Sequence, residues 1–123
     1  MTRRELIEYC MSKPGAYEDY PFDKLNDGTS WTVMRHSGNR KTFALIFERQ
    51  GGLWINLKCE PMLAELLRSA YQSVLPGYHM NKAHWNSVIV GGDLPEERLL
   101  EMIDHSFELT KPKAPRRIRP DAP

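Results

Sequence analysis

The sequence predicts an α+β domain in which helices pack against an antiparallel sheet, with the element order α-β-β-β-β-α-β-α. Aromatic and β-branched runs in the middle of the chain are joined by short links that contain glycine, which is typical of antiparallel hairpins. Segments with the helical spacing of apolar residues flank these runs. With 123 residues, 41% of them hydrophobic and 27% charged, the chain is expected to form one domain around one core.

The first helix is expected over residues 3–12. Thr2 followed by Glu5 matches a capping box, and Pro14-Gly15 ends the segment. A short strand is expected near residues 22–25, and Asn26-Asp27-Gly28 is expected to form the turn after it.

Three strands are expected next, at residues 31–36, 42–48 and 53–58, with turns at 37–39 and 50–52. Strand alternation places Phe43, Leu45 and Phe47 on one face and Ala44, Ile46 and Glu48 on the other. One face should pack on helices, and the other should meet water or a partner.

A second helix is expected from Glu60-Pro61, because proline is tolerated in a first turn. Its apolar stripe consists of Leu63, Leu66, Leu67 and Ala70. A further strand is expected over residues 84–90, joined to the sheet by a non-local connection. A third helix starts at Pro95-Glu96-Glu97, and its buried stripe consists of Leu99, Ile103 and Phe107.

The net charge of +1 hides an asymmetry between the body and the end of the chain. Residues 111–123 contain five basic residues, one acidic residue and four prolines, whereas residues 1–110 contain 12 basic and 15 acidic residues. We therefore expect a folded, acidic domain over residues 1–110 and a basic, disordered tail over 111–123. Such a tail either contacts a polyanion or only keeps the protein soluble.

The sequence contains no recognisable phosphate-binding loop, dinucleotide fingerprint or nucleophile elbow. We therefore predict no catalytic residue and no cofactor. His79 and His84, with Cys59 or Cys10, do not match a metal-ligand spacing, so no metal site is predicted. His36 is expected at the surface. No apolar run is long enough to span a membrane and no export leader opens the chain, so we expect a cytoplasmic protein.

The segment from Pro76 to Val88 carries the most information about function. It reads PGYHMNKAHWNSV and concentrates aromatic rings, imidazoles, amides and one cation. Loops that hold rigid aromatic and polar groups together often bind a partner. The same residues also suit a structural role, in which the aromatic rings cover the edge of the core and Asn81 caps a helical turn.

The sequence resembles the MmcQ/YjbR family of small bacterial proteins over almost the whole body. The resemblance rests on Tyr20-Pro21-Phe22-Asp23, Lys41-Thr42-Phe43-Ala44, Leu57-Lys58-Cys59-Glu60-Pro61, the 76–86 segment and Ser106-Phe107-Glu108-Leu109. It implies a fold similar to that of frataxin and CyaY. It also implies double-stranded DNA binding through a double-wing motif, an inference that itself rests on the fold.

The leading hypothesis is therefore a DNA-binding protein. The candidate contacts are Arg35, Arg40, Lys41, Lys58, Asn81, Lys82, His84 and Asn86. Trp54 is a candidate for stacking or wedging. The acidic body opposes DNA contact, so binding should be weak or strongly salt-dependent. The alternative is a module that binds a small anionic ligand through Tyr78, His79, Lys82 and Trp85, or a protein partner, with no nucleic-acid role.

Overall fold

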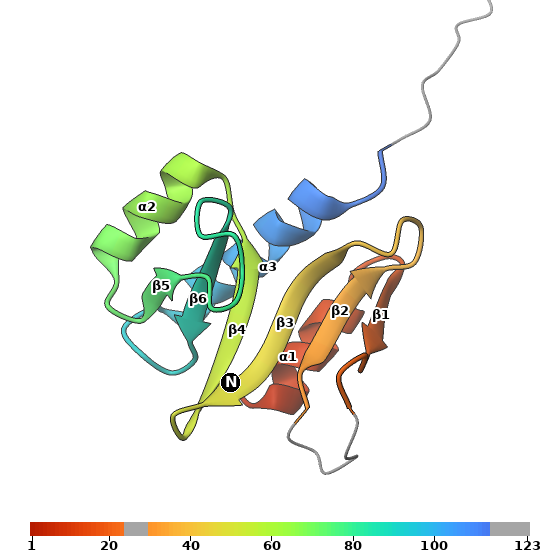
Figure 1. Ribbon diagram of the computed structural model, residues 1–123, viewed down its shortest axis with the longest axis horizontal. Coiled ribbons are helices and arrows are strands. Elements are labelled where there is room, and N and C mark those ends of the chain that lie inside the picture. Colours follow the sequence, from red (N-terminus) through yellow and green to blue (C-terminus); the bar gives the residue numbers. More distant parts are fainter. Residues whose placement is uncertain (24–29, 114–123) are drawn as a thin grey trace, which may run out of the picture.

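The computed structural model describes residues 1–23 and 30–113. The described chain contains three helices and one antiparallel sheet with the strand order β1-β2-β3-β4-β6-β5 (Figure 1). The elements are α1 (Arg3–Met11), β1 (Ala16–Asp19), β2 (Thr32–His36), β3 (Thr42–Arg49), β4 (Gly52–Lys58), α2 (Pro61–Ala70), β5 (Val74–Pro76), β6 (Trp85–Ile89) and α3 (Glu96–Thr110). The predicted α+β class is confirmed.

The first strand and one edge strand differ from the prediction. β1 lies at Ala16–Asp19, earlier in the chain than predicted. Of the strand predicted near residues 22–25, the structure describes Phe22, which lies in a turn, and Asp23, which follows that turn. The predicted turn at 26–28 and the rest of that strand lie outside the described residues. β5 was not predicted, because three residues ending in proline are too short to show a strand pattern; it pairs with β6 at the edge of the sheet.

The helix starts follow the predicted chemistry. The Thr2 hydroxyl accepts a hydrogen bond from the backbone N–H of Glu5, and the Glu5 carboxylate accepts one from the backbone N–H of Thr2. α2 begins at Pro61. Two predicted stripe residues are wrong: Leu66 of α2 is 64% exposed and Ala70 is also exposed, because α2 packs at the edge of the sheet beside β5 and β6.

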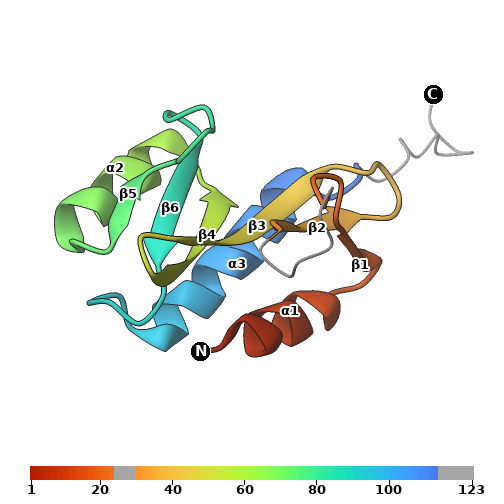
Figure 2. The same ribbon diagram turned by 60° about the horizontal axis from the view of Figure 1, so that its bottom comes forward.

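The helices pack on one face of the sheet. α1 contacts β1 and β2, and α3 contacts β3 and β4 (Figure 2). The sheet residues in this core include Met34, Ala44, Ile46, Ile55 and Val88, which pair across neighbouring strands. The opposite face, which we call the open face, is not covered by a helix of the described chain. The loop between β5 and β6 lies over part of it.

A β-bulge changes the predicted alternation along β3. Met34 pairs with Ala44 but Arg35 pairs with Thr42, so Phe43 is the extra residue on the bulged strand. Phe43 therefore does not share the open face with Leu45 and Phe47, but packs in the core with the ring of Phe107 on α3, 5.1 Å away.

His36 was predicted at the surface, and this is wrong. Its ring lies 4.4 Å from that of Phe107, and only 2% of the residue is exposed. Nε2 of His36 is hydrogen-bonded to the Thr110 hydroxyl at 2.8 Å. Burial lowers the pKa of this imidazole.

Candidate functional site

Strand directions bring most of the predicted DNA contacts to one end of the sheet. Leu57 pairs with Ala44 near the start of β3, and Lys58 pairs with Trp85 at the start of β6. The β2–β3 hairpin, the end of β4 and the loop before β6 therefore share one end, which is uppermost in Figure 1. We call it the basic end, and define it by Arg40, Lys41, Lys58, Lys82, Lys111 and Lys113.

Arg35 joins the strands of this end to one another. Its Nε donates to the Asp19 carboxylate at 2.8 Å, and its Nη1 donates to the Thr42 hydroxyl at 3.1 Å and to the Arg40 carbonyl at 3.2 Å. Its charge is therefore partly neutralised. Arg40 and Lys41 are exposed at the tip of the hairpin, and within the described chain neither forms an ion pair.

The loop before β6 is folded back on itself. The Asn81 side chain accepts a hydrogen bond from the Ala83 N–H at 2.9 Å, and the Lys82 ammonium donates to the Gly77 carbonyl at 3.1 Å. Both residues are exposed, as is His84, whose carbonyl accepts from the Cys59 N–H. These three side chains thus remain available to a partner.

Asn86 does not belong to the surface. It is 0% exposed, its amide donates to the Ala64 carbonyl, and its oxygen accepts from Nε of Arg68 at 2.6 Å. The predicted contact of Asn86 with DNA is therefore wrong, because α2 covers the side chain through Ala64 and Arg68. Arg68, which was not predicted to have a role, also donates to the Lys82 carbonyl and so fixes the loop to α2.

The end of α3 lies against the hairpin. The Asn39 amide donates to the Thr110 carbonyl at 2.9 Å, and a Cβ atom at Gly38 would come within 2.7 Å of the Pro112 ring. Lys111 pairs with Glu108, and Lys113 is exposed. The first residues of the predicted tail thus start at the basic end. Residues 114–123 lie outside the described chain.

The four residues predicted for a small ligand are not brought together. Tyr78 and His79 line a cavity of about 440 Å³ at the other end of the open face, but Lys82 and Trp85 do not. We call this cavity the aromatic pocket. Its lining residues are Phe22, Trp31, Leu45, Phe47, Glu48, Arg49, Tyr78, His79 and Met80. Trp54 lies beside it and is 3% exposed, so the predicted stacking of Trp54 on DNA is wrong.

A buried polar pair holds Tyr78 at the pocket. Asn56 on β4 and Ser87 on β6 face each other across the two strands, both fully buried, and the Ser87 hydroxyl donates to the Asn56 side-chain oxygen. The Asn56 amide donates to the Tyr78 carbonyl at 2.9 Å, and the Ser87 hydroxyl accepts from the Tyr78 N–H at 2.8 Å. The backbone of Tyr78 is therefore fixed on both sides.

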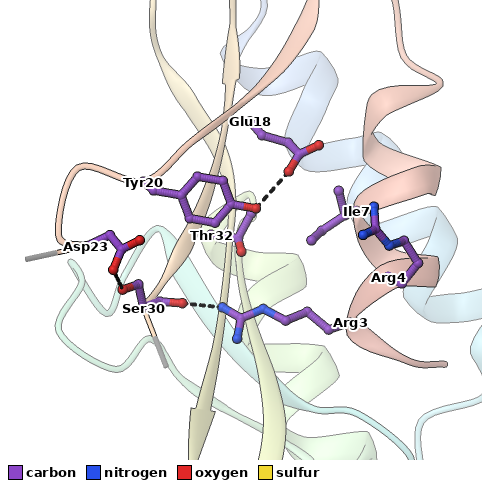
Figure 3. Close-up of a pocket in the computed structure, with 8 residues that line it drawn as sticks. All are labelled: Arg3, Arg4, Ile7, Glu18, Tyr20, Asp23, Ser30 and Thr32. Atoms are coloured by element: carbon purple, nitrogen blue, oxygen red, sulfur yellow. Dashed lines mark hydrogen bonds between the residues drawn. The ribbon is translucent and has the colours of Figure 1, made fainter. Parts of the chain in front are cut away.

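A second cavity, of about 390 Å³, lies between α1 and the start of β2 (Figure 3). Its polar groups mostly bind one another. Arg3 donates to the carbonyls of Ser30 and Ile46, the Tyr20 hydroxyl donates to Glu18 at 2.7 Å, and the Ser30 hydroxyl donates to Asp23 at 2.6 Å. These contacts hold the start of β2 against α1. Among the described lining residues, the buried Thr32 hydroxyl and the Arg4 guanidinium keep no such partner.

Both cysteines are buried free thiols. Burial raises the pKa of the Cys10 thiol to about 12 and that of the Cys59 thiol to about 11, so both are protonated at neutral pH. Among residues 1–23 and 30–113, no three His, Cys, Asp or Glu side chains are grouped closely enough to hold a metal ion. The same part of the chain contains no helix with the length and apolarity needed to cross a membrane.

The arrangement defines a class of α+β proteins with one antiparallel sheet, helices on one face and a partly open second face. The chain belongs to the YjbR family, whose family model matches residues 11–109. The resemblance that the sequence suggested is thereby confirmed.

Relatives and solved structures agree with this assignment. The chain is 36% identical to the uncharacterized protein YjbR of Escherichia coli (strain K12), covering 88% of this chain and 86% of that protein. It is 35% identical to the uncharacterized protein YyaQ of Bacillus subtilis, covering 90% and 99%. A Pseudomonas syringae crystal structure matches with a TM-score of 0.77 and 33% identity over 89% of this chain and 99% of the other. A Deinococcus radiodurans structure with a DUF419 domain matches with a TM-score of 0.76 and 34% identity, covering 88% and 77%.

Proposed function

We propose that the protein binds double-stranded DNA through its basic end. The observation that carries the proposal is that Arg40, Lys41, Lys58 and Lys82 come from three separate segments but share one end of the sheet. Phosphate contacts supply most non-specific affinity for DNA, and they require cations that are clustered rather than numerous. The β2–β3 hairpin and the loop before β6 stand on either side of the β4 end, which is the arrangement that two wings on one duplex require.

The rest of the body limits the affinity. Residues 1–110 carry 15 acidic against 12 basic residues, so the duplex is repelled by the surface outside the basic end. Lys113 adds positive charge next to the hairpin, whereas the charge of Lys111 is partly neutralised by Glu108. Asn81 and His84 offer polar groups for phosphates or base edges. We therefore expect weak binding with a strong dependence on salt concentration.

The test is a fluorescence anisotropy titration of a labelled duplex at several salt concentrations. About four phosphate contacts give a slope of about −3.6 in log K against log salt. Lys41→Glu and Lys82→Glu should each weaken binding several-fold. Arg4→Glu is the matched control: it makes the same change in net charge on α1, at the opposite end of the sheet, and should have little effect. Absence of binding at low salt, or equal effects of all three variants, would reject the proposal.

The proposal describes a binding protein rather than an enzyme. The buried, protonated thiols of Cys10 and Cys59 support this, because a cysteine nucleophile needs an accessible thiolate. The alternative, a module for a small anionic ligand, is favoured by one observation at a different place: the aromatic pocket contains an arginine side chain that has no acceptor among residues 1–23 and 30–113.

A further inference from the structure

We propose that the aromatic pocket binds a planar aromatic acid, meaning an aromatic or heteroaromatic ring that carries a carboxylate or a phosphate. The ring lies against the aromatic walls, and the acidic group is bound by Arg49. This site is separate from the basic end, so the proposal does not depend on DNA binding.

The walls of the pocket favour a flat ligand. The ring of Trp31 stacks on that of Phe47 with centroids 4.0 Å apart and planes 8° from parallel, and the Tyr78 ring lies 5.9 Å from Phe47. Phe22 at the rim is 61% exposed, and Trp31 is half-buried. Exposed aromatic faces in a concave site are stabilised when another ring displaces water from them. The volume of about 440 Å³ lies within the range of small-ligand pockets.

Arg49 supplies the charge selectivity. Its guanidinium carbon lies 4.2 Å from the centroid of the Tyr78 ring and 4.9 Å from that of the Trp54 ring, so two aromatic side chains hold it by cation–π contact. Its N–H groups have no acceptor in the described part of the chain. A guanidinium that is positioned by rings and keeps its donors free is arranged to bind an oxyanion through paired hydrogen bonds.

The backbone positions these groups before any ligand arrives. Gln50 and Gly51, both with positive φ, form the tight turn after Arg49 and direct β4 back along β3. His79 has a φ of 62°, a region that non-glycine residues seldom adopt and that surrounding contacts must hold. Its ring lies 4.0 Å from that of Tyr78. The Asn56–Ser87 pair fixes Tyr78, so the pocket loses little conformational entropy on binding.

The nearby charges are compatible with an acidic ligand. Glu48 is the acidic residue among those that line the pocket, and strand alternation directs its side chain away from the face that carries Phe47 and Arg49. His79 is exposed at the rim and adds a donor. The cavity beside α1 is a weaker candidate, because Arg3 is already bound to two carbonyls and the second arginine, Arg4, shares the lining with the carboxylates of Glu18 and Asp23.

The test uses two pairs of probes with the full chain labelled with ¹⁵N: AMP against adenosine, and indole-3-acetate against indole. Amide and indole N–H resonances are followed up to about 5 mM probe. We expect saturable shifts of Trp31, Arg49, Tyr78 and His79 with at least one acid, and about tenfold weaker binding of its uncharged partner. Arg49→Gln should reduce the affinity for the acid to that of the uncharged partner. Arg98→Gln, on the exposed side of α3, should not change it.

The comparison of acid with uncharged partner needs no variant, so it remains decisive if Arg49→Gln fails to fold. The proposal is overturned if neither acid gives saturable shifts at the pocket, or if acid and uncharged partner bind equally. It is also overturned if the shifts centre on Lys41 and Lys82, because the acid would then bind as a counterion at the basic end. Loss of DNA binding in Lys41→Glu would leave the pocket result unchanged, so the two proposals fail separately.

Discussion

Asn56→Ala tests whether the buried polar pair supports both the sheet and the aromatic pocket. The change removes the hydrogen bond to the Tyr78 carbonyl at 2.9 Å and the acceptor of the Ser87 hydroxyl. A neutral hydrogen bond contributes about 1 kcal/mol, and a buried group left without its partner costs about 1–3 kcal/mol. Because Ser87 is fully buried, we expect the free energy of unfolding to fall by about 2–4 kcal/mol, with a decrease in Tm of about 10 °C.

The assay is urea unfolding of four proteins: the natural chain, Asn56→Ala, Ser87→Ala and the double variant. Each single change leaves an unpaired buried group, whereas the double change removes both members of the pair. The cost of the double variant should therefore be smaller than the sum of the single costs by about 1–2 kcal/mol. The m-values should stay constant, because the area exposed on unfolding hardly changes.

Asn81→Ala is the matched control, since it removes an exposed asparagine that bonds only within its own loop. It should cost less than about 1 kcal/mol. The reasoning is refuted if Asn56→Ala costs no more than Asn81→Ala, or if the two changes at Asn56 and Ser87 are additive.

Two further changes test the loop and the core. Gly77→Ala would place a Cβ atom 2.8 Å from the Trp85 Cβ and 2.9 Å from the Trp85 carbonyl oxygen, so it should cost about 1–3 kcal/mol in urea unfolding; an unchanged midpoint would contradict this contact. Burial holds the pKa of His36 in the folded protein below its ordinary value of 6.5, so on acidification the unfolded chain binds a proton at this imidazole before the folded protein does. The free energy of unfolding should therefore fall as the pH drops below about 6.5, until the folded pKa is reached. His36→Gln should flatten the stability profile below about pH 6.5. His84→Gln, which changes an exposed histidine, should leave the slope intact, and an equal slope in both variants would refute the assignment.

The hairpins were predictable because their chemistry is local. The turn at 50–52 joins strands of matching alternation, and the structure forms it with positive φ at Gln50 and Gly51. The bulge at Phe43 was not predictable, since β2 and β3 must be paired before the extra residue is visible. β1 was misplaced because its four residues AYED carry no apolar alternation and form a strand only by pairing with β2.

The candidate sites show the same limit. Four cations of the basic end, Arg40, Lys41, Lys58 and Lys82, were selected from the sequence because hairpins and family motifs indicated them. Asn86 was selected with them because an amide in a polar segment is typical of a surface, and only α2 shows that it is covered. Arg49 and Trp31 were missed, because 18 positions separate them along the chain and only the sheet brings them to one cavity. The polar residues Asn56 and Ser87 within apolar strands were the available signal for a buried network.

The two proposed sites lie at opposite ends of one sheet, and this separation has a physical cause. Because of strand alternation and the bulge at Phe43, the side chains of Arg35 and Thr42 lie on the open face near the basic end, where they form a hydrogen bond that links β2 and β3. Beyond the bulge, Leu45, Phe47 and Arg49 follow one another on that face, and the aromatic rings gather there. The loop before β6 spans both regions, with Lys82 at one side and Tyr78 at the other. Asn56 and Ser87 form hydrogen bonds with the backbone of Tyr78 and not with Lys82. An anion bound at Arg49 would therefore contact a rigid aromatic wall, whereas a duplex at the basic end would contact exposed side chains that can change conformation. Rigid aromatic surroundings suit discrimination among small rings, and adjustable cations suit a phosphate backbone whose sequence is not read.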